Sequence, residues 1–246
     1  MLLRRIAPDP PIQEALGRAG GGAFDAVVPV HTHYDHALDS ATVAAATGAR
    51  LLGGASAAQI GVGGGLPQDR ITLVTPGRPV PCGRFTLTLV ESAHCPPDRY
   101  PGVIEHPVVP PARASEYRCG EAWSILLEHA SGRTALIQGS AGFLRGALTD
   151  RAAEVAYPGV GQLGQQDPGY IREYWRESVQ AVGARRVVLI HWDDFFRPLT
   201  KPLRTLPHLM DDLDATMQVL VPLAREQDVP LHFPTLWRRE DPWADL

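Results

Sequence analysis

The feature that most constrains this chain is a group of three histidines and one aspartate within six residues. The run His31-Thr32-His33-Tyr34-Asp35-His36 directly follows Ala23–Val30, an apolar stretch that predicts a strand. Positions i, i+2 and i+5 do not share a helix face. In a loop leaving a strand, however, the first two side chains can converge on one ion and the last two on another. Imidazole and carboxylate groups are ligands of zinc and iron. The run predicts a metal site, with a His-rich surface loop as the alternative.

Length and composition are those of a globular protein. The chain has 246 residues, 44% hydrophobic and 20% charged, enough for one layered domain over residues 1–246. The net charge of −4 is spread along the chain, so a small-molecule substrate is expected and nucleic acid is not.

No stretch approaches the ~20 apolar residues of a membrane span. Without a secretory signal, a cytoplasmic location is the default, unless the natural N-terminus is longer. Cys82, Cys95 and Cys119 have no zinc-type spacing and are expected to be unpaired.

Short helices and strands alternate along the chain, which indicates an α/β fold. Helices are expected at 11–19, 37–47 and 56–60, and apolar periodicity predicts two more. Their buried faces would hold Ile171, Tyr174, Trp175, Ser178, Val179 and Val182 in one, and Leu209, Leu213, Met217 and Leu220 in the other. Strands are expected at 23–30, 49–52, 70–75, 80–82, 84–90, 122–128, 134–138 and 186–190, with a hairpin turn at Ser131-Gly132-Arg133. The Pro-rich stretch 95–120 cannot form central strands and predicts a long functional loop or lid.

The run at residues 31–36 matches the HxHxDH signature of the metallo-β-lactamase superfamily, and the chain resembles this superfamily from residue 23 to its C-terminus. The resemblance implies an αββα sandwich with a dinuclear metal site. Two later histidines stand where the superfamily has ligands, each after a predicted strand. By this resemblance the first metal is held by His31, His33 and His94, and the second by Asp35, His36 and His191. The expected cofactor is one or two zinc ions, with iron or manganese as alternatives. His106, His129, His208 and His232 match no position of the pattern.

The chain departs from the superfamily pattern in two places. The superfamily places a bridging aspartate after the hairpin, and Ser140 stands at that position here. The loss of one negative charge should weaken the second site. Asp193 and Asp194 would compensate if they orient the ligands or act as surrogate ligands. The alternative interpretation of these two aspartates is a helix-capping or solvated pair. The second departure is a short N-terminal part, which predicts a reduced or truncated β-layer. An exposed sheet edge there would lower stability or be covered in a homo-oligomer.

The resemblance implies a metal-dependent hydrolase that uses a metal-activated water on an ester, lactone, phosphodiester or amide bond. Asp35 would orient the water and help to accept its proton, and Arg99 or Arg113 would neutralise negative charge. Two interpretations are open for five aromatic residues: they line an apolar pocket near the site, or they pack in the core. These residues are Tyr100, Tyr117, Trp192, Phe195 and Phe196.

Three functional alternatives stay open beside a general hydrolase. The tail His191-Trp192-Asp193-Asp194-Phe195 is loosely similar to the branch with ascorbate 6-phosphate lactonase and N-acyl phosphatidylethanolamine phospholipase D. A non-catalytic or degenerate metal-binding module is favoured by Ser140 and opposed by the otherwise full ligand set. A di-iron redox enzyme is less favoured, because such enzymes usually retain the bridging carboxylate.

Overall fold

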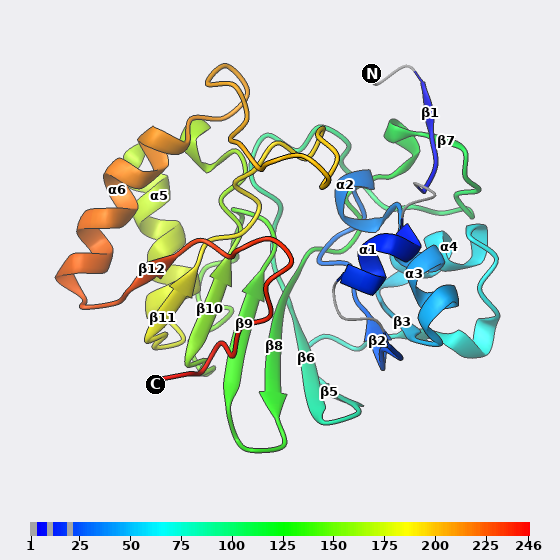
Figure 1. Ribbon diagram of the computed structural model, residues 1–246, viewed down its shortest axis with the longest axis horizontal. Coiled ribbons are helices and arrows are strands. Elements are labelled where there is room, and N and C mark those ends of the chain that lie inside the picture. The colour runs from blue at the N-terminus through cyan, green and yellow to red at the C-terminus, as the bar shows by residue number, and fades with distance from the viewer. Residues whose placement is uncertain (1–3, 9–11, 19–21) are drawn as a thin grey trace.

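Two β-sheets pack face to face between two helical layers in the computed structural model, which describes residues 4–8, 12–18 and 22–246 (Figure 1). The larger sheet has seven strands in the order β12-β11-β10-β9-β8-β6-β5, and the smaller has three in the order β2-β3-β4. Apolar side chains from both sheets, including Leu52 of the smaller and Leu89 and Ile125 of the larger, form the core between them. The expected αββα arrangement is therefore confirmed.

The larger sheet joins an antiparallel half to a parallel half. Its strands are β5 (Pro79–Cys82), β6 (Phe85–Glu91), β8 (Trp123–His129), β9 (Thr134–Gln138), β10 (Val155–Pro158), β11 (Arg186–Val188) and β12 (Leu231–His232). The predicted hairpin connects β8 and β9, and Gly132 at its turn has φ = 81°, a backbone conformation that glycine adopts without strain. Because β6, β9, β10 and β11 run in the same direction, their C-terminal ends meet at one edge of the sheet.

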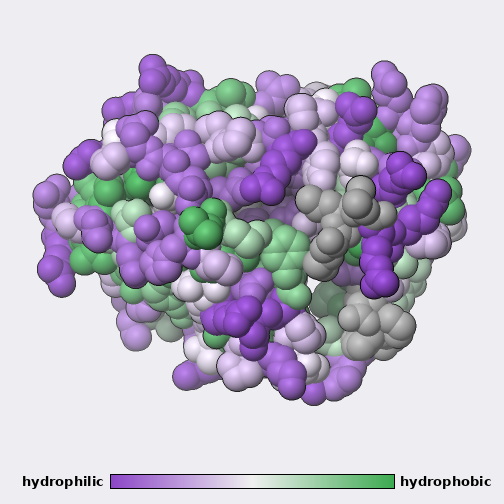
Figure 2. Space-filling model, turned by 90° about the horizontal axis from the view of Figure 1, so that it is seen from above, coloured by the Kyte–Doolittle hydropathy of each residue, from purple (hydrophilic) through white to green (hydrophobic). Residues whose placement is uncertain are grey.

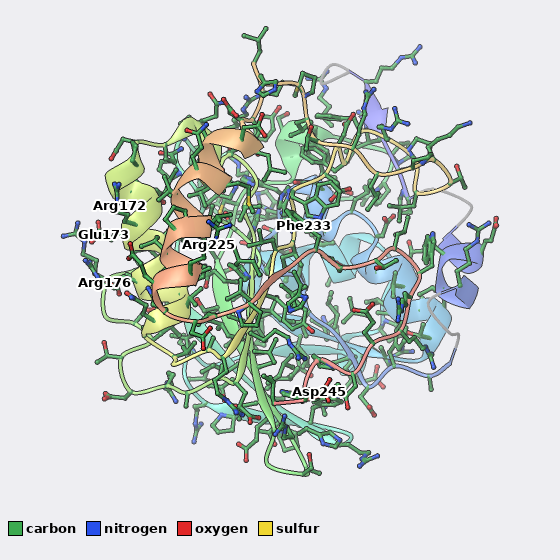
Figure 3. The ribbon with its side chains drawn as sticks, turned by 60° about the vertical axis from the view of Figure 1, so that its left-hand side comes forward. Arg172, Glu173, Arg176, Arg225, Phe233 and Asp245 are labelled. Carbon is green, nitrogen blue, oxygen red and sulfur yellow. The ribbon has the colours of Figure 1, made fainter. Side chains whose placement is uncertain are left out.

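Helices α5 (Pro168–Trp175) and α6 (Leu213–Glu226) cover the outer face of this sheet. The π-helical segment η4 (Arg176–Gln180) continues α5. All six residues predicted for the buried face at 171–182 are buried, whereas Arg172, Glu173 and Arg176 lie on the outer side (Figure 3). The prediction for the last helix is wrong at one residue, since Leu209 lies before α6 and is 98% exposed. Asp212 caps α6 by accepting a hydrogen bond from the Ala215 amide, which fixes the later start.

The smaller sheet consists of three short parallel strands, β2 (Ala26–Val27), β3 (Arg50–Gly53) and β4 (Ile71–Leu73). Around it lie α1 (Ile12–Arg18), α2 (Tyr34–Ala37), α3 (Ser40–Thr47), α4 (Ala55–Gly63) and the 3₁₀ turn η1 (Gln68–Arg70). This small layer agrees with the expected reduction. Two boundaries were predicted wrongly: the strand at 23–30 is only two residues long, and the helix at 37–47 is divided after Ala37.

The Pro-rich segment 95–120 has little regular structure but is not loosely attached. It contains the 3₁₀ turn η2 (Ala114–Glu116) and the strand β7 (Ala112–Arg113), which pairs with β1 (Arg5–Ile6). Outside this segment, the 3₁₀ turn η3 (Leu163–Gln165) precedes α5. Ile104, Val108 and Tyr117 are buried against Ala37 and Ile60. A role of this segment as a functional loop or lid stays a prediction. No helix within the described residues is both long enough and apolar enough to cross a membrane.

Candidate metal centre

The histidine run is fixed by hydrogen bonds to a distant part of the chain. The Thr32 amide donates to the Cys119 carbonyl at 2.8 Å, and the Thr32 hydroxyl donates to the Arg118 carbonyl at 2.6 Å. The backbone of His33 then begins α2, because its carbonyl accepts from the amides of His36 and Ala37. Asp35 and His36 consequently lie on a one-turn helix, whereas His31 and His33 precede it.

The three residues predicted for the first metal are brought together. Suitable ligand atoms of His31, His33 and His94 lie within 4.8 Å of one another, and we call these residues the first cluster. Both nitrogens of His31 are buried and have no hydrogen-bond partner among the described residues. Burial, helped by His36 and the other nearby histidines, lowers the pKa of His31 well below its usual value. Burial and then His33 also lower the pKa of His94. Neutral imidazoles are the form that binds metals.

Two neighbouring acceptors orient the rings of the first cluster. His94 Nδ1 lies 2.6 Å from the Cys95 carbonyl oxygen, and His33 Nε2 lies 3.1 Å from Asp98 Oδ1. Because a carbonyl or carboxylate oxygen only accepts hydrogen bonds, the nitrogen that faces it would be the donor when the ring is neutral. The other nitrogen of each ring keeps its lone pair for a metal, an arrangement that commonly fixes histidine ligands.

Asp98 was missed by the sequence analysis. It lies in the irregular Pro-rich segment, where no strand end or spacing signalled it. The Tyr100 amide holds it by donating to Oδ1 at 3.0 Å, and the Tyr100 carbonyl in turn accepts from the Cys119 amide at 2.8 Å. Since the Cys119 carbonyl also accepts from the Thr32 amide, the Pro-rich segment is tied to the histidine run at the residue next to His33.

The three residues predicted for the second metal also meet, and we call them the second cluster. Nε2 of His36 and Nε2 of His191 each lie 3.5 Å from Asp35 Oδ2. Burial alone would raise the pKa of Asp35, but the hydrogen bond with His191 and the charges of the two histidines outweigh it and lower the pKa. Burial lowers the pKa of His36 to about 3, against the opposing effect of Asp35.

The backbone around His191 is adapted to this position. His191 has φ = 56°, a conformation that non-glycine residues rarely adopt. A Cβ atom on Gly161 would approach His191 Nδ1 to 2.8 Å, so the glycine makes room for the imidazole. The two clusters are continuous, because the ring centroids of His31 and His36 are 4.1 Å apart.

Ser140 lies two residues after the end of β9 and lines one cavity together with His94 and His191. Its hydroxyl accepts a hydrogen bond from the Cys95 amide at 2.9 Å. The surrogate role considered for Asp194 is not supported by the geometry. Asp194 is buried and forms an ion pair with Arg204 at 3.0 Å, while the Asp193 backbone pairs with Thr205. Neither aspartate belongs to a group of potential metal ligands among the described residues.

The clusters face a cavity of about 400 Å³. It is lined by His33, Tyr34, Asp35, His94, Arg99, Tyr100, Ser140, Gly161, Gln162, His191, Phe195, Phe196, Leu206 and Met210. Of the residues predicted for the pocket, Arg99, Tyr100, Phe195 and Phe196 line it and Arg113 does not. Tyr117 and Trp192 follow the other interpretation, core packing: Tyr117 is fully buried in a separate core cluster, and Trp192 packs against Phe233.

The residues fit a metal centre on three grounds. Five imidazoles and one carboxylate converge, the buried nitrogens of His31 lack partners within the described chain, and His33 and His94 are oriented by acceptors behind them. The four other histidines of the described chain, His106, His129, His208 and His232, belong to neither cluster. His208 does have ligand atoms close to those of Asp212 and Asp214, near the start of α6.

No protein-family model matches the chain, and no curated protein matches it. Solved structures do. The metallo hydrolase Igni18 of Ignicoccus hospitalis superposes with a TM-score of 0.54 at 15% identity, over 86% of this chain and 76% of that one. YhfI of Bacillus subtilis, a metallo-β-lactamase fold protein, superposes with 0.53 at 13% identity, over 94% and 83%.

A third similar structure belongs to a protein described as an oxidative enzyme. CmlA of Streptomyces venezuelae, a diiron β-hydroxylase, gives a TM-score of 0.51 at 13% identity, over 86% of this chain but only 44% of CmlA. At such identities the similarities establish the fold and not the reaction, and the similarity to a lactonase or phospholipase branch stays a prediction. The chain has the metallo-β-lactamase fold.

Proposed function

We propose that the protein is a metal-dependent hydrolase that directs an activated water at an ester, lactone, phosphodiester or amide bond. The observation that supports this most is the position of the two clusters at one wall of a cavity large enough for a small substrate. A bound zinc ion, or iron or manganese in its place, would supply Lewis acidity and lower the pKa of water.

The chain's own residues would hold and orient the reactants. His31, His33 and His94 would bind the first ion, and Asp35, His36 and His191 the second. Asp35 would also accept a hydrogen bond from the attacking water and help to take its proton. Its carboxylate belongs to the cavity lining, which gives it access to a substrate. Arg99, another lining residue, would neutralise negative charge on the substrate or intermediate.

A protein nucleophile has less support. The Ser140 hydroxyl lines the cavity, but its recorded contact is the hydrogen bond it accepts from the Cys95 amide, and no base is paired with it in the described structure. The three cysteines, Cys82, Cys95 and Cys119, are free and buried. A reaction that needs no covalent intermediate agrees better with these surroundings.

Two other functions have one observation each in their favour. The similarity to CmlA, whose name describes a diiron hydroxylase, favours a redox reaction at the same residues. Ser140 in place of a bridging carboxylate favours a degenerate metal-binding module. Ser140 also counts against a di-iron centre, because carboxylate bridges are common at such sites.

Metal analysis of the purified protein, followed by a hydrolase panel, tests the proposal. The panel should contain lactones, phosphodiesters, β-lactams and acyl esters, each assayed with metal-reconstituted protein. We expect about one or two equivalents of zinc and hydrolysis of at least one class. Bound iron with no hydrolysis would favour the redox alternative, and absence of both metal binding and hydrolysis would favour a degenerate module.

A further inference from the structure

The cavity wall beside the two clusters is apolar. Phe195, Phe196, Leu206 and Met210 line the cavity, and all four come from one stretch of chain between β11 and α6. The rings of Phe195 and Phe196 are 4.4 Å apart, and the Phe195 ring lies 5.6 Å from that of His191. Apolar surface therefore begins directly beside the second cluster.

Two apolar side chains of this stretch are more exposed to solvent than side chains that pack in a core. Phe195 is 38% exposed and Met210 is 37% exposed although both line the cavity. Seen from above, hydrophobic residues lie near the middle of a face that is largely hydrophilic (Figure 2). Apolar side chains that gather around a cavity with a few polar groups are typical of a site for an apolar ligand group.

The size of the cavity limits that group. Small-molecule sites usually measure roughly 300–1,000 Å³, so about 400 Å³ is near the lower end. Such a volume accommodates one medium-length chain or one aromatic ring beside the scissile bond. It is too small to enclose a lipid with two long chains. Arg99 adds a cation to the same lining.

We infer that the substrate is an ester with a single apolar acyl group, which packs against Phe195, Phe196, Leu206 and Met210. This inference rests on the proposed hydrolase function. In the reaction, the water oxygen bonds to the acyl carbon, the bond from that carbon to the alcohol oxygen breaks, and a water proton passes to the departing alcohol. The acyl group leaves as a carboxylic acid. Burial of each further methylene should improve kcat/KM by up to about fourfold.

A series of p-nitrophenyl esters tests the inference in the reconstituted full-length protein. We expect kcat/KM to rise about tenfold or more from the acetyl to the octanoyl ester. Met210→Gln keeps the side-chain length but makes the wall polar, and should lower the octanoyl-to-acetyl ratio by about threefold. The matched control is Leu209→Gln, since Leu209 is adjacent, 98% exposed and not part of the lining. A flat dependence on acyl length in the unchanged protein would overturn the inference.

A binding measurement separates this inference from the proposed function. Anilinonaphthalene sulfonate, a dye that fluoresces in apolar surroundings, should bind the protein more weakly after Met210→Gln and equally after Leu209→Gln, with zinc content unchanged in both variants. If no ester is hydrolysed but the dye responds in this way, ester hydrolysis is wrong and the apolar subsite is supported. Equal dye binding by both variants contradicts the subsite, whatever the activity.

Discussion

The first and second clusters contain the same number of candidate ligands but differ in burial and in the groups that orient them. His31 of the first cluster is 1% exposed, and the other two members have acceptors behind their rings. In the second cluster the side chains of His36 and His191 are 16% and 21% exposed, and their recorded partner is Asp35, itself a member of the cluster. The first cluster is therefore the better pre-organised of the two, and we expect the second to depend more on bound ions for its arrangement.

Charge leads to the same distinction. The two clusters contain one carboxylate, Asp35, and the neutral Ser140 lines the same cavity. By the resemblance to the superfamily, Ser140 takes the position of an aspartate that would add a second negative charge. Asp98 adds negative charge beside the first cluster, 3.1 Å from His33. Two divalent ions close together repel each other unless anionic groups lie nearby. We therefore expect the first site to bind an ion tightly and the second to bind one more weakly.

The largest expected effect follows removal of a first-cluster ligand. His31→Ala or His94→Ala should abolish retention of metal and reduce hydrolysis to background, because each removes one of the three ligands of the better-organised site. Metal content by mass spectrometry and the hydrolase panel provide the measurement. His106→Ala is the matched control, since His106 is exposed and outside both clusters. Unchanged metal content in both cluster variants would contradict the site assignment.

Removal of a second-cluster ligand should have a smaller effect on metal content. His191→Ala should leave about one equivalent bound at the first cluster while hydrolysis falls strongly. If the two sites were equivalent, or one ion were shared among all six residues, His191→Ala would lose as much metal as His31→Ala. Equal losses would remove the distinction between the clusters.

Asp98→Asn tests the support behind the first cluster. Loss of the carboxylate beside His33 should weaken metal binding by about 10- to 100-fold without altering the melting temperature of the metal-free protein. Glu105→Gln is the control, because Glu105 is an exposed acid of the same Pro-rich segment. Competition with a zinc chelator measures the affinity. Equal affinities for the two variants would mean that Asp98 does not position His33.

The smallest expected effect is a gain. Ser140→Asp should raise occupancy of the second site, because a carboxylate there adds negative charge between the ions. Ser131→Asp, in the hairpin turn, introduces the same charge beyond the opposite end of β9 from Ser140. Zinc stoichiometry at limiting metal distinguishes the two variants. No increase in zinc stoichiometry for Ser140→Asp would mean that another group already supplies the negative charge between the ions.

The sequence contained enough to predict the fold and the six candidate ligands, because these depend on local patterns. The run at 31–36 is contiguous, and His94 and His191 each follow an apolar strand. Asp98 could not be found in this way, since hydrogen bonds of the irregular segment place it against His33.

The aromatic residues illustrate the other limit. Phe195 lines the cavity, but Trp192, three residues earlier, packs on Phe233, and Tyr117 lies in a separate core. Their hydrophobicity predicted burial and could not predict which neighbour each would meet. Leu209 is a similar case, because apolar periodicity continued past the point where the Asp212 cap starts α6.

Stepwise titration of the metal-free protein with zinc tests the central claim most directly. We expect two resolved steps, a tight first equivalent and a weaker second, and we expect His191→Ala to remove only the second step. No zinc binding, or two equal steps that both disappear in His191→Ala, would contradict an unequal pair of sites built from these two clusters.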